Sequence, residues 1–420
     1  MAFKGNLWHH KEFLKFWTGD TITQFTGQIS GLALSVLAVQ ILNVTDFEVG
    51  LLNALGFIAF PTLGLFVGVW MDRMKRKKVM IVMDMIQVAT LASVPTFFVI
   101  SHALFLKYGL YLLYTVSFMM GLTTLFFDIA YQSYLPSLVN KEDVVEGNQK
   151  LQTSASAASV VGPSVASGLM AIIDAALSIA VDAIGTLAGA FALLLIRKPE
   201  PEPTQTSDGS ERHFFGEMKE GIKVVTGNKL LWTQAGCTAT LNFGLNILNV
   251  ALILFALRSL DISKGLIGIA FTIGAVGFFA GAMISTALTE RLGVGRTIAL
   301  AVALTSGQLI ALLANHSDAV FVIGVAYFIS NLGLVAYNVI SVSLRQIITP
   351  NRLQGRMNAT MRTIVWGTVP AGSLIGGILC TGFGIVPAGI IGVIVAGGGV
   401  LWIVLGPIFK LSKLPEPVGD

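Results

Sequence analysis

Long apolar segments separated by short polar loops occupy most of this 420-residue chain. An α-helix needs about 20 apolar residues to cross the hydrocarbon core of a bilayer, and these segments have that length. Within hydrocarbon the backbone must satisfy its own hydrogen bonds, so each segment is expected to be helical. The segments cover residues 14 to 41, 49 to 71, 78 to 100, 108 to 137, 151 to 173, 176 to 196, 230 to 257, 264 to 289, 296 to 314, 319 to 347, 357 to 381 and 385 to 409. We therefore predict an all-α membrane protein with twelve transmembrane helices.

The composition excludes a soluble globular protein, because 54% of the residues are hydrophobic, only 12% are charged and the mean hydropathy is +0.77. The two cysteines, Cys237 and Cys380, lie inside apolar segments and lack the spacing of metal ligands or of a disulfide framework. The net charge of +4 reflects cations in the loops, so it predicts no nucleic-acid partner. We expect no metal and no cofactor.

The positions of the basic residues predict the orientation of the chain. Of the 27 Lys and Arg residues, only Lys107, Arg258 and Lys264 fall in loops that would lie outside if the chain starts in the cytoplasm, and the other 24 fall inside. Cytoplasmic loops collect Lys and Arg, so both termini are predicted to be cytoplasmic. The first apolar segment lacks a signal-peptide cleavage pattern and is expected to remain as a helix.

A change in composition after the sixth predicted helix marks a boundary. Pro199, Pro201 and Pro203 alternate with acids in a polar stretch that is typical of an extended or disordered linker. The next residues, 214 to 225, place apolar side chains at helical spacing, which predicts an amphipathic helix on the inner membrane surface. We predict an N-terminal six-helix bundle (1–197), a cytoplasmic linker with this helix (198–228) and a C-terminal six-helix bundle (229–420).

A basic loop follows the second predicted helix. Gly68 is followed by Asp72 and Arg73, and then by Arg76 and Lys77. The stretch 73 to 78 holds five bases in six residues, which favours the cytoplasmic side of the membrane. From these residues alone, an ordinary cytoplasmic loop remains an alternative to a specific motif.

The spacing of these residues resembles the loop between helices two and three in the major facilitator superfamily of transporters, although Lys75 stands where that family usually has Gly. A weaker copy, Thr289 to Arg296, follows the eighth predicted helix, as a repeat of two pseudo-symmetric bundles requires. The resemblance implies transport by alternating access around a site near the midplane. It also implies that Asp128 joins Asp72 and Arg76 in a latch at the inner gate.

Further stretches resemble the macrolide-efflux and enterobactin-exporter branch of that superfamily. They are Tyr131 to Val139, Gly162-Pro163, Val181 to Ala183, Glu217 to Gly221 and Thr349 to Arg356. Gly162 and Pro163 resemble the antiporter signature of the fifth helix, although Ala166 and Ser167 replace glycines that the signature prefers. The resemblance implies a bacterial cytoplasmic (inner) membrane location, a small-molecule substrate, protons as the exchanged ion and a monomer.

Four acids lie inside predicted helices, where charge is expensive and each is a functional candidate. They are Asp20, Asp84, Asp128 and Asp182. A proton carrier needs a carboxyl that is neutral in one state and charged in another, and Asp20, Asp84 and Asp182 are the candidates. Asp20 is preferred, because it shares one helix face with Gln24 and Gln28. The alternative is a structural ion pair or a hydrogen bond between helices.

Polar residues form stripes on four predicted helices, and lipid cannot satisfy them. Besides the first helix, they comprise Thr124, Tyr131 and Gln132 on the fourth, Asn242, Asn246 and Asn249 on the seventh, and Tyr327, Asn331 and Asn338 on the tenth. The resemblance implies that these four helices line the substrate cavity. For any single Asn, the alternative is an interhelical hydrogen bond of roughly 0.6 kcal/mol.

The amides and aromatics of these stripes, with few charges among them, favour a bulky and moderately apolar ligand. We therefore expect a secondary transporter that exports a small amphipathic, drug-like molecule by proton antiport. Two alternatives remain open: export of a siderophore or lysolipid, and a membrane receptor that has this fold without transport. An enzyme is not expected, because no nucleophile and base arrangement or nucleotide-binding loop occurs in the sequence.

Overall fold

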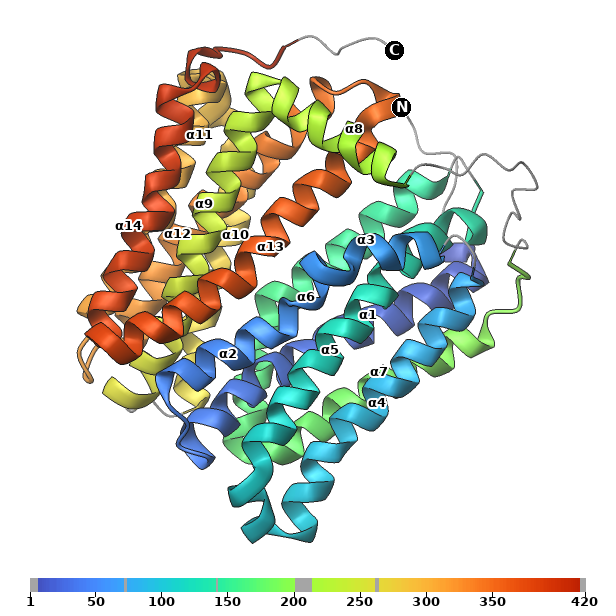
Figure 1. Cartoon of the computed structure of the whole chain (residues 1–420), viewed down its shortest axis with the longest axis vertical. Helices are drawn as coiled ribbons and strands as arrows, with labels where there is room; N and C mark the ends of the chain where they lie inside the picture. Colours follow the sequence, from blue (N-terminus) through green and yellow to red (C-terminus); the bar gives the residue numbers. More distant parts are fainter. Residues whose placement is uncertain (1–6, 72–73, 141–142, 201–213, 261–263, 416–420) are drawn as a thin grey trace. The chain divides into compact units, whose positions relative to one another are not determined.

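The structure, a computed structural model of the chain, describes residues 7–71, 74–140, 143–200, 214–260 and 264–415 (Figure 1). In these ranges no residue is in a β-strand, and twelve helices are long and apolar enough to cross a membrane. The prediction of an all-α membrane protein with twelve spans is confirmed. Asp72, Arg73 and residues 201–213 of the predicted linker lie outside the described residues.

The chain divides into two compact units. Unit 1 comprises Met1–Val44 and Leu55–Gly209, and unit 2 comprises Thr45–Ala54 and Ser210–Asp420. The elements that lie wholly in unit 1 are η1 (Leu7–His9), α1 (Lys11–Val36), η2 (Leu37–Ile41), α3 (Ala59–Met71), α4 (Arg76–Ile100), α5 (His102–Leu138), α6 (Val144–Ile172) and α7 (Ala175–Leu195). Helix α2 (Asp46–Phe57) contributes its first part to unit 2 and its last residues to unit 1.

Unit 2 contains the remaining elements. They are α8 (Phe214–Gly227), α9 (Lys229–Leu254), η4 (Phe255–Ser259), α10 (Lys264–Leu292), α11 (Val294–Thr305), η5 (Ser306–Leu313), α12 (Ala319–Ile347), α13 (Asn351–Phe383), α14 (Ile385–Leu405) and η6 (Pro407–Lys410). Helix α8 occupies the predicted amphipathic segment. Its Val225 is buried in the core of unit 2 while Ile222 is exposed, so part of its apolar face packs on protein.

The predicted second helix, 49 to 71, differs from the structure, which breaks it at Ile58 into α2 and α3. Pro61 explains the break. It has no backbone N–H, and its ring clashes with the carbonyl of the residue four positions earlier, which is Phe57. The start of α2 is fixed by a capping box, in which Thr45 Oγ1 and Glu48 Oε2 lie 2.8 Å apart and each accepts a backbone N–H.

The helices of the two units pair in the same way. In unit 1, α1 packs on α6 and α7, α4 packs on α5 and α7, and α3 packs on α5. In unit 2, α9 packs on α13 and α14, α11 packs on α12 and α14, and α10 packs on α12. Each pairing in one unit has its counterpart six predicted spans later, which supports the internal repeat inferred from the loop motif.

The repeat extends to an unusual detail of the backbone. Helices α1 and α9 each run for 26 residues and then continue as a π-helical turn of 5 residues, η2 and η4 respectively. A π-turn is rare, because it places one extra residue in a helical turn. It occurs at the same position of the first helix of both halves.

Close approach between helices relies on small residues, because lipid supplies no hydrophobic drive for helix association. A Cβ on Gly277 or on Gly281 of α10 would collide with a backbone carbonyl of α12. At the interface of α1 and α7, a Cβ on Gly19 would lie 2.7 Å from the Cβ of Ala192. Glycine at these positions therefore allows α10 to pack closely on α12, and α1 on α7.

Candidate functional site

Asp20 lies on α1, where it is 6% exposed and faces α5. The Tyr131 hydroxyl donates to Asp20 Oδ2 at 3.4 Å, and Gln24 Nε2 donates to Oδ1 at 3.5 Å. The i, i+4 spacing of Asp20 and Gln24 puts both side chains on one face of α1. Asp20 and Gln24 lie on the polar face predicted for the first helix, and the fold brings Tyr131 of α5 to them.

Asp84 of α4 and Asp128 of α5 lie within electrostatic range of this carboxyl. Asp84 is 4% exposed and interacts with the charge of Asp20, while Asp128 interacts with both Asp20 and Tyr131. Among the described Lys and Arg side chains, none forms an ion pair with Asp20 or Asp84. Asp20, Asp84, Asp128 and Tyr131 form one cluster, which we call the carboxyl cluster.

The surroundings of the carboxyl cluster are apolar and aromatic. The ring of Tyr131 lies 5.2 Å from that of Phe16 and 6.0 Å from that of Phe127. Along α1, the side chain of Gln28 lies against Gly162 of α6, where a Cβ would collide with it. Gly162 belongs with Pro163 to the predicted antiporter motif. Because it has no side chain, it leaves room for Gln28 on the polar face of α1.

The amides predicted on α9 and α12 are partly used inside the protein. Asn242 Nδ2 donates to the Thr238 carbonyl and Asn246 Nδ2 to the Asn242 carbonyl, both at 2.8 Å and within α9. Asn331 Nδ2 donates to the Gly274 carbonyl of α10 at 3.1 Å. For Asn331 this is the interhelical hydrogen bond that the sequence analysis kept as an alternative.

For the other predicted cavity residues, the described contacts assign no role. Asn249, Asn338 and Thr124 are exposed, and Tyr327 packs edge-on against the ring of Phe271 at 5.1 Å. The side chains of Gln132 and Gly68 are not among those described. A substrate-lining role for these residues therefore remains a prediction.

The predicted inner-gate residues Arg76 and Lys77 begin helix α4, and Glu200 caps their backbone. The N–H of Arg76 donates to Glu200 Oε1 at 2.9 Å, and the N–H of Lys77 donates to Oε2 at 3.1 Å. Arg76 Nη1 also lies 3.9 Å from Oε1, and the Glu200 side chain is only 6% exposed. The N-cap residue Lys75 provides no capping side chain, so Glu200 supplies the missing acceptors.

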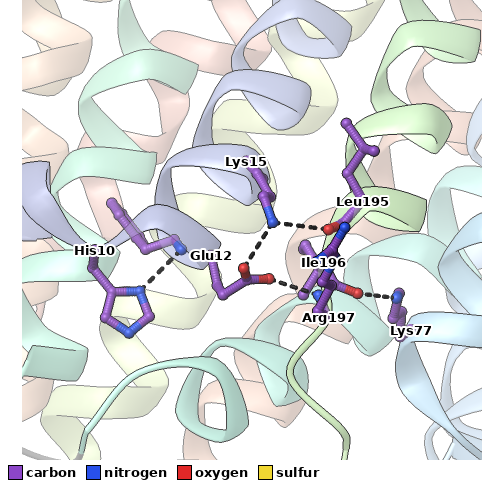
Figure 2. A network of polar contacts seen from close by, with 8 residues as sticks. His10, Glu12, Lys15, Lys77, Leu195, Ile196 and Arg197 are labelled. Carbon is purple, nitrogen blue, oxygen red and sulfur yellow. Dashed lines mark hydrogen bonds and ion pairs between the residues drawn. The ribbon is translucent and has the colours of Figure 1, made fainter.

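The end of α7 is fixed beside this cap by a second set of contacts, shown in Figure 2. Lys77 Nζ donates to the Ile196 carbonyl at 2.6 Å, and Lys15 Nζ donates to the Leu195 carbonyl at 2.9 Å. Glu12 accepts from Lys15 and from the backbone N–H of Arg197, both at 2.7 Å. Lysines here satisfy the carbonyls that a helix leaves free at its C-terminus.

Sequence reasoning missed Glu200, Glu12 and Lys15 as organising residues. Glu200 belongs to the alternation of Pro and Glu that is typical of a linker, and no local pattern shows that it reaches back to α4. A polar contact in unit 2 was also missed: Gln234 Nε2 donates to the Ser341 carbonyl at 2.6 Å. The signal available in the sequence was a polar residue inside each of two apolar segments, Gln234 in 230 to 257 and Ser341 in 319 to 347.

The sequence model of the Major Facilitator Superfamily matches residues 16–245. Macrolide efflux protein A of Streptococcus pyogenes is 27% identical over 230 residues, which are 54% of this chain and 54% of that protein. Macrolide efflux protein A of Enterococcus faecalis is 30% identical over 182 residues, which are 43% of this chain and 54% of that protein. The chain spans about half the length of these curated relatives.

A solved structure with a similar fold is the crystal structure of a bacterial homologue of the iron transporter ferroportin in an inward-facing state. Its TM-score is 0.75, and the match covers 94% of this chain and 98% of that chain at 16% identity. At this identity the likeness shows the fold alone. The family match spans α1 to α7 and continues into α9, which includes both the carboxyl cluster and the capped start of α4. The chain belongs to the Major Facilitator Superfamily of membrane transporters.

Proposed function

We propose that this protein exports a small amphipathic, drug-like molecule across the bacterial cytoplasmic membrane in exchange for protons, with both termini in the cytoplasm. The observation that carries the coupling half of this proposal is the carboxyl cluster around Asp20. Similarity to macrolide efflux proteins over about half the chain supports the substrate class and the direction of transport.

Asp20 has the features that a proton carrier requires. It is buried in a membrane-spanning helix, and its described partners are neutral donors, Tyr131 and Gln24. Asp84 and Asp128 are near enough that ionising all three carboxyls together is opposed by their mutual repulsion. Asp20 can therefore accept and release a proton without breaking an ion pair to a described Lys or Arg side chain.

Substrate would pass beside the polar faces of α1, α5, α9 and α12. Gln24, Gln28, Tyr131, Asn242 and Asn246 supply amides and an aromatic hydroxyl on otherwise apolar helices. Asp72, Arg73, Arg76, Lys77 and Asp128, together with Gly68, would form the inner gate. The cap that Glu200 places on Arg76 and Lys77 supports a fixed geometry for the start of α4 in that gate.

The test is uptake into proteoliposomes under an imposed pH gradient, with a panel of macrolides, other amphipathic drugs and siderophores. The unmodified protein should accumulate a drug only when the gradient is present. Asp20→Asn should still bind the drug but should not respond to the gradient. The matched control is Asp174→Asn, since Asp174 is exposed just before α7.

Other outcomes would contradict specific parts of the proposal. Uptake that ignores the gradient would remove proton coupling. A fully coupled Asp20→Asn variant would exclude Asp20 as the carrier and move the test to Asp84 and Asp182. Accumulation of a siderophore with no response to any drug would overturn the substrate class. Binding without transport of any compound would favour a receptor.

A further inference from the structure

Asp182 lies apart from the carboxyl cluster, in contact with a different set of side chains. It is on α7 and is 0% exposed. Thr186, one turn later, donates its hydroxyl to Asp182 Oδ1 at 3.5 Å. From α1, the hydroxyls of Thr26 and Ser30 also face this carboxyl. One carboxyl and three hydroxyl groups therefore meet between two helices that both cross the membrane.

Small residues on α7 make this meeting possible. A Cβ on Gly185 would collide with the side chain of Thr26, and a Cβ on Gly189 would collide with that of Thr23. With glycine at these positions, α1 comes near enough for its hydroxyls to lie directly against α7. Thr26 and Ser30 are four residues apart, so both point to the same side of α1. The arrangement is built by the packing and does not depend on a loop.

Two oxygen atoms in this group are buried and make no hydrogen bond of ordinary geometry, although Ser30 and Asp182 face each other. They are Asp182 Oδ2 and Ser30 Oγ, and both residues are 0% exposed. Buried polar atoms normally have a partner, so each orphan requires an explanation. In addition, no described Lys, Arg or His side chain forms an ion pair with Asp182. A buried carboxyl is stable when it takes up a proton or when a cation balances its charge.

We infer that Asp182, Ser30, Thr26 and Thr186 form a binding site for a dehydrated monovalent cation of the sodium type. Carboxylate and hydroxyl oxygens are hard ligands, which suit hard cations. The single carboxylate neutralises one positive charge, whereas a divalent ion would leave a net charge in an apolar environment. The two orphan oxygens would become ligands. This site goes beyond the proposed proton-coupled export, because it uses none of the residues of the carboxyl cluster.

The experiment measures sodium binding to the purified full-length protein in detergent. Radioactive sodium should bind saturably, and unlabelled lithium should compete better than potassium. In parallel, the melting temperature should rise by about 2 to 5 °C when choline chloride is replaced by sodium chloride at equal ionic strength and fixed pH. The choline arm separates a bound ion from general screening by salt.

Three variants locate the site. Asp182→Asn keeps the size of the side chain and should abolish both the saturable binding and the rise in melting temperature. Ser30→Ala, which retains the carboxyl, should lower sodium affinity by about tenfold, as second-sphere and weak-ligand changes commonly do. Asp174→Asn, at an exposed acid near the start of the same helix, should bind sodium as the unmodified protein does.

The outcomes distinguish the cation from simpler explanations. If the unmodified protein binds no labelled sodium, the proposal fails whatever the variants do. If sodium has no effect but the melting temperature of the unmodified protein depends on pH in a way that Asp182→Asn removes, then Asp182 holds a proton and the cation site is excluded. If Asp182→Asn does not fold, the Ser30→Ala affinity decides. Failure here would leave export through Asp20 untouched, because Asp182 does not belong to the carboxyl cluster.

Discussion

Two helix pairs that occupy equivalent positions in the repeat differ sharply in their chemistry. The interface of α1 and α7 contains Asp182 among hydroxyl groups, whereas the described contacts of α9 with α14 involve glycines, apolar side chains and a hydrogen bond from Trp402 to Thr240. There, a Cβ on Gly244 would collide with the backbone of Ala396, and α14 contains no charged residue at all. The same packing is thus achieved without a carboxyl, so packing does not explain why unit 1 retains one in a costly place.

The largest expected effect concerns the carboxyl cluster, which has no counterpart on α9. Asp20→Asn should reduce transport driven by a pH gradient by about 100-fold, because a positioned proton carrier contributes at least that much. The measurement is initial uptake in proteoliposomes, with drug binding as the control for folding. Thr238 of α9 occupies the position equivalent to Asp20 of α1. If Thr238→Asp restored coupling in the Asp20→Asn background, a carboxyl could serve equally well in either half, and the contrast between the halves would not explain coupling.

The second effect compares glycines at the two interfaces. Gly244→Ala forces a Cβ into backbone and should cost about 2 to 3 kcal/mol of stability, since overpacking cannot be relieved there. Gly185→Ala meets only the Thr26 side chain and should cost about 1 kcal/mol. Thermal unfolding in detergent measures both. Only Gly185→Ala should also weaken the response to sodium, and an equal loss in both variants would argue against a site at Asp182.

A smaller effect is expected at the start of α4. Glu200→Gln removes the negative charge from the cap of Arg76 and Lys77 and should cost about 1 kcal/mol. Glu290→Gln is the matched control, because Glu290 is an exposed acid in the weaker copy of the loop in unit 2. The measurement is the melting temperature of the Glu200→Gln and Glu290→Gln variants in detergent, and only Glu200→Gln should melt at a lower temperature. Equal melting temperatures would show that the cap contributes nothing to stability.

The smallest effect concerns the amides of unit 2. Asn331→Leu removes the hydrogen bond to the Gly274 carbonyl and should cost about 0.6 kcal/mol. If Asn331 is a packing residue, the affinity for a transported drug should be unchanged when measured by fluorescence quenching. A loss of affinity well beyond the loss of stability would instead support the predicted place of Asn331 in the substrate cavity.

The sequence was sufficient to predict the helices, because length, hydropathy and charge asymmetry are properties of each segment alone. It also pointed to Asp20, since i, i+4 spacing defines a helix face before any partner is known. The break at Ile58 could have been predicted by giving more weight to Pro61, whereas the change to a 3₁₀ helix at Ser306, inside the predicted span 296 to 314, has no such signal in the sequence. The residues that could be chosen from the sequence were therefore those with a local signature.

Partners across helices could not be predicted in the same way. Tyr131 and Asp20 are 111 positions apart, and their contact depends on the packing of α1 against α5. Glu200 belongs to a stretch whose composition is typical of a linker, yet it reaches back to α4. Thr26 and Ser30 are small polar residues with no distinctive pattern, and only the nearness of α7 gives them a role. These contacts depend on which helices pack together, and residue type alone does not indicate that.

The π-turns at the ends of α1 and α9 bear on the history of the chain. A π-turn is in effect a one-residue insertion that a helix tolerates at some expense. Finding it after 26 residues in the first helix of each half is simpler to explain by inheritance than by two separate insertions. The insertion would then be older than the duplication that produced the two halves. The acids Asp20, Asp84 and Asp182 inside the membrane-spanning helices of unit 1 would then be a difference between the halves that arose after the duplication.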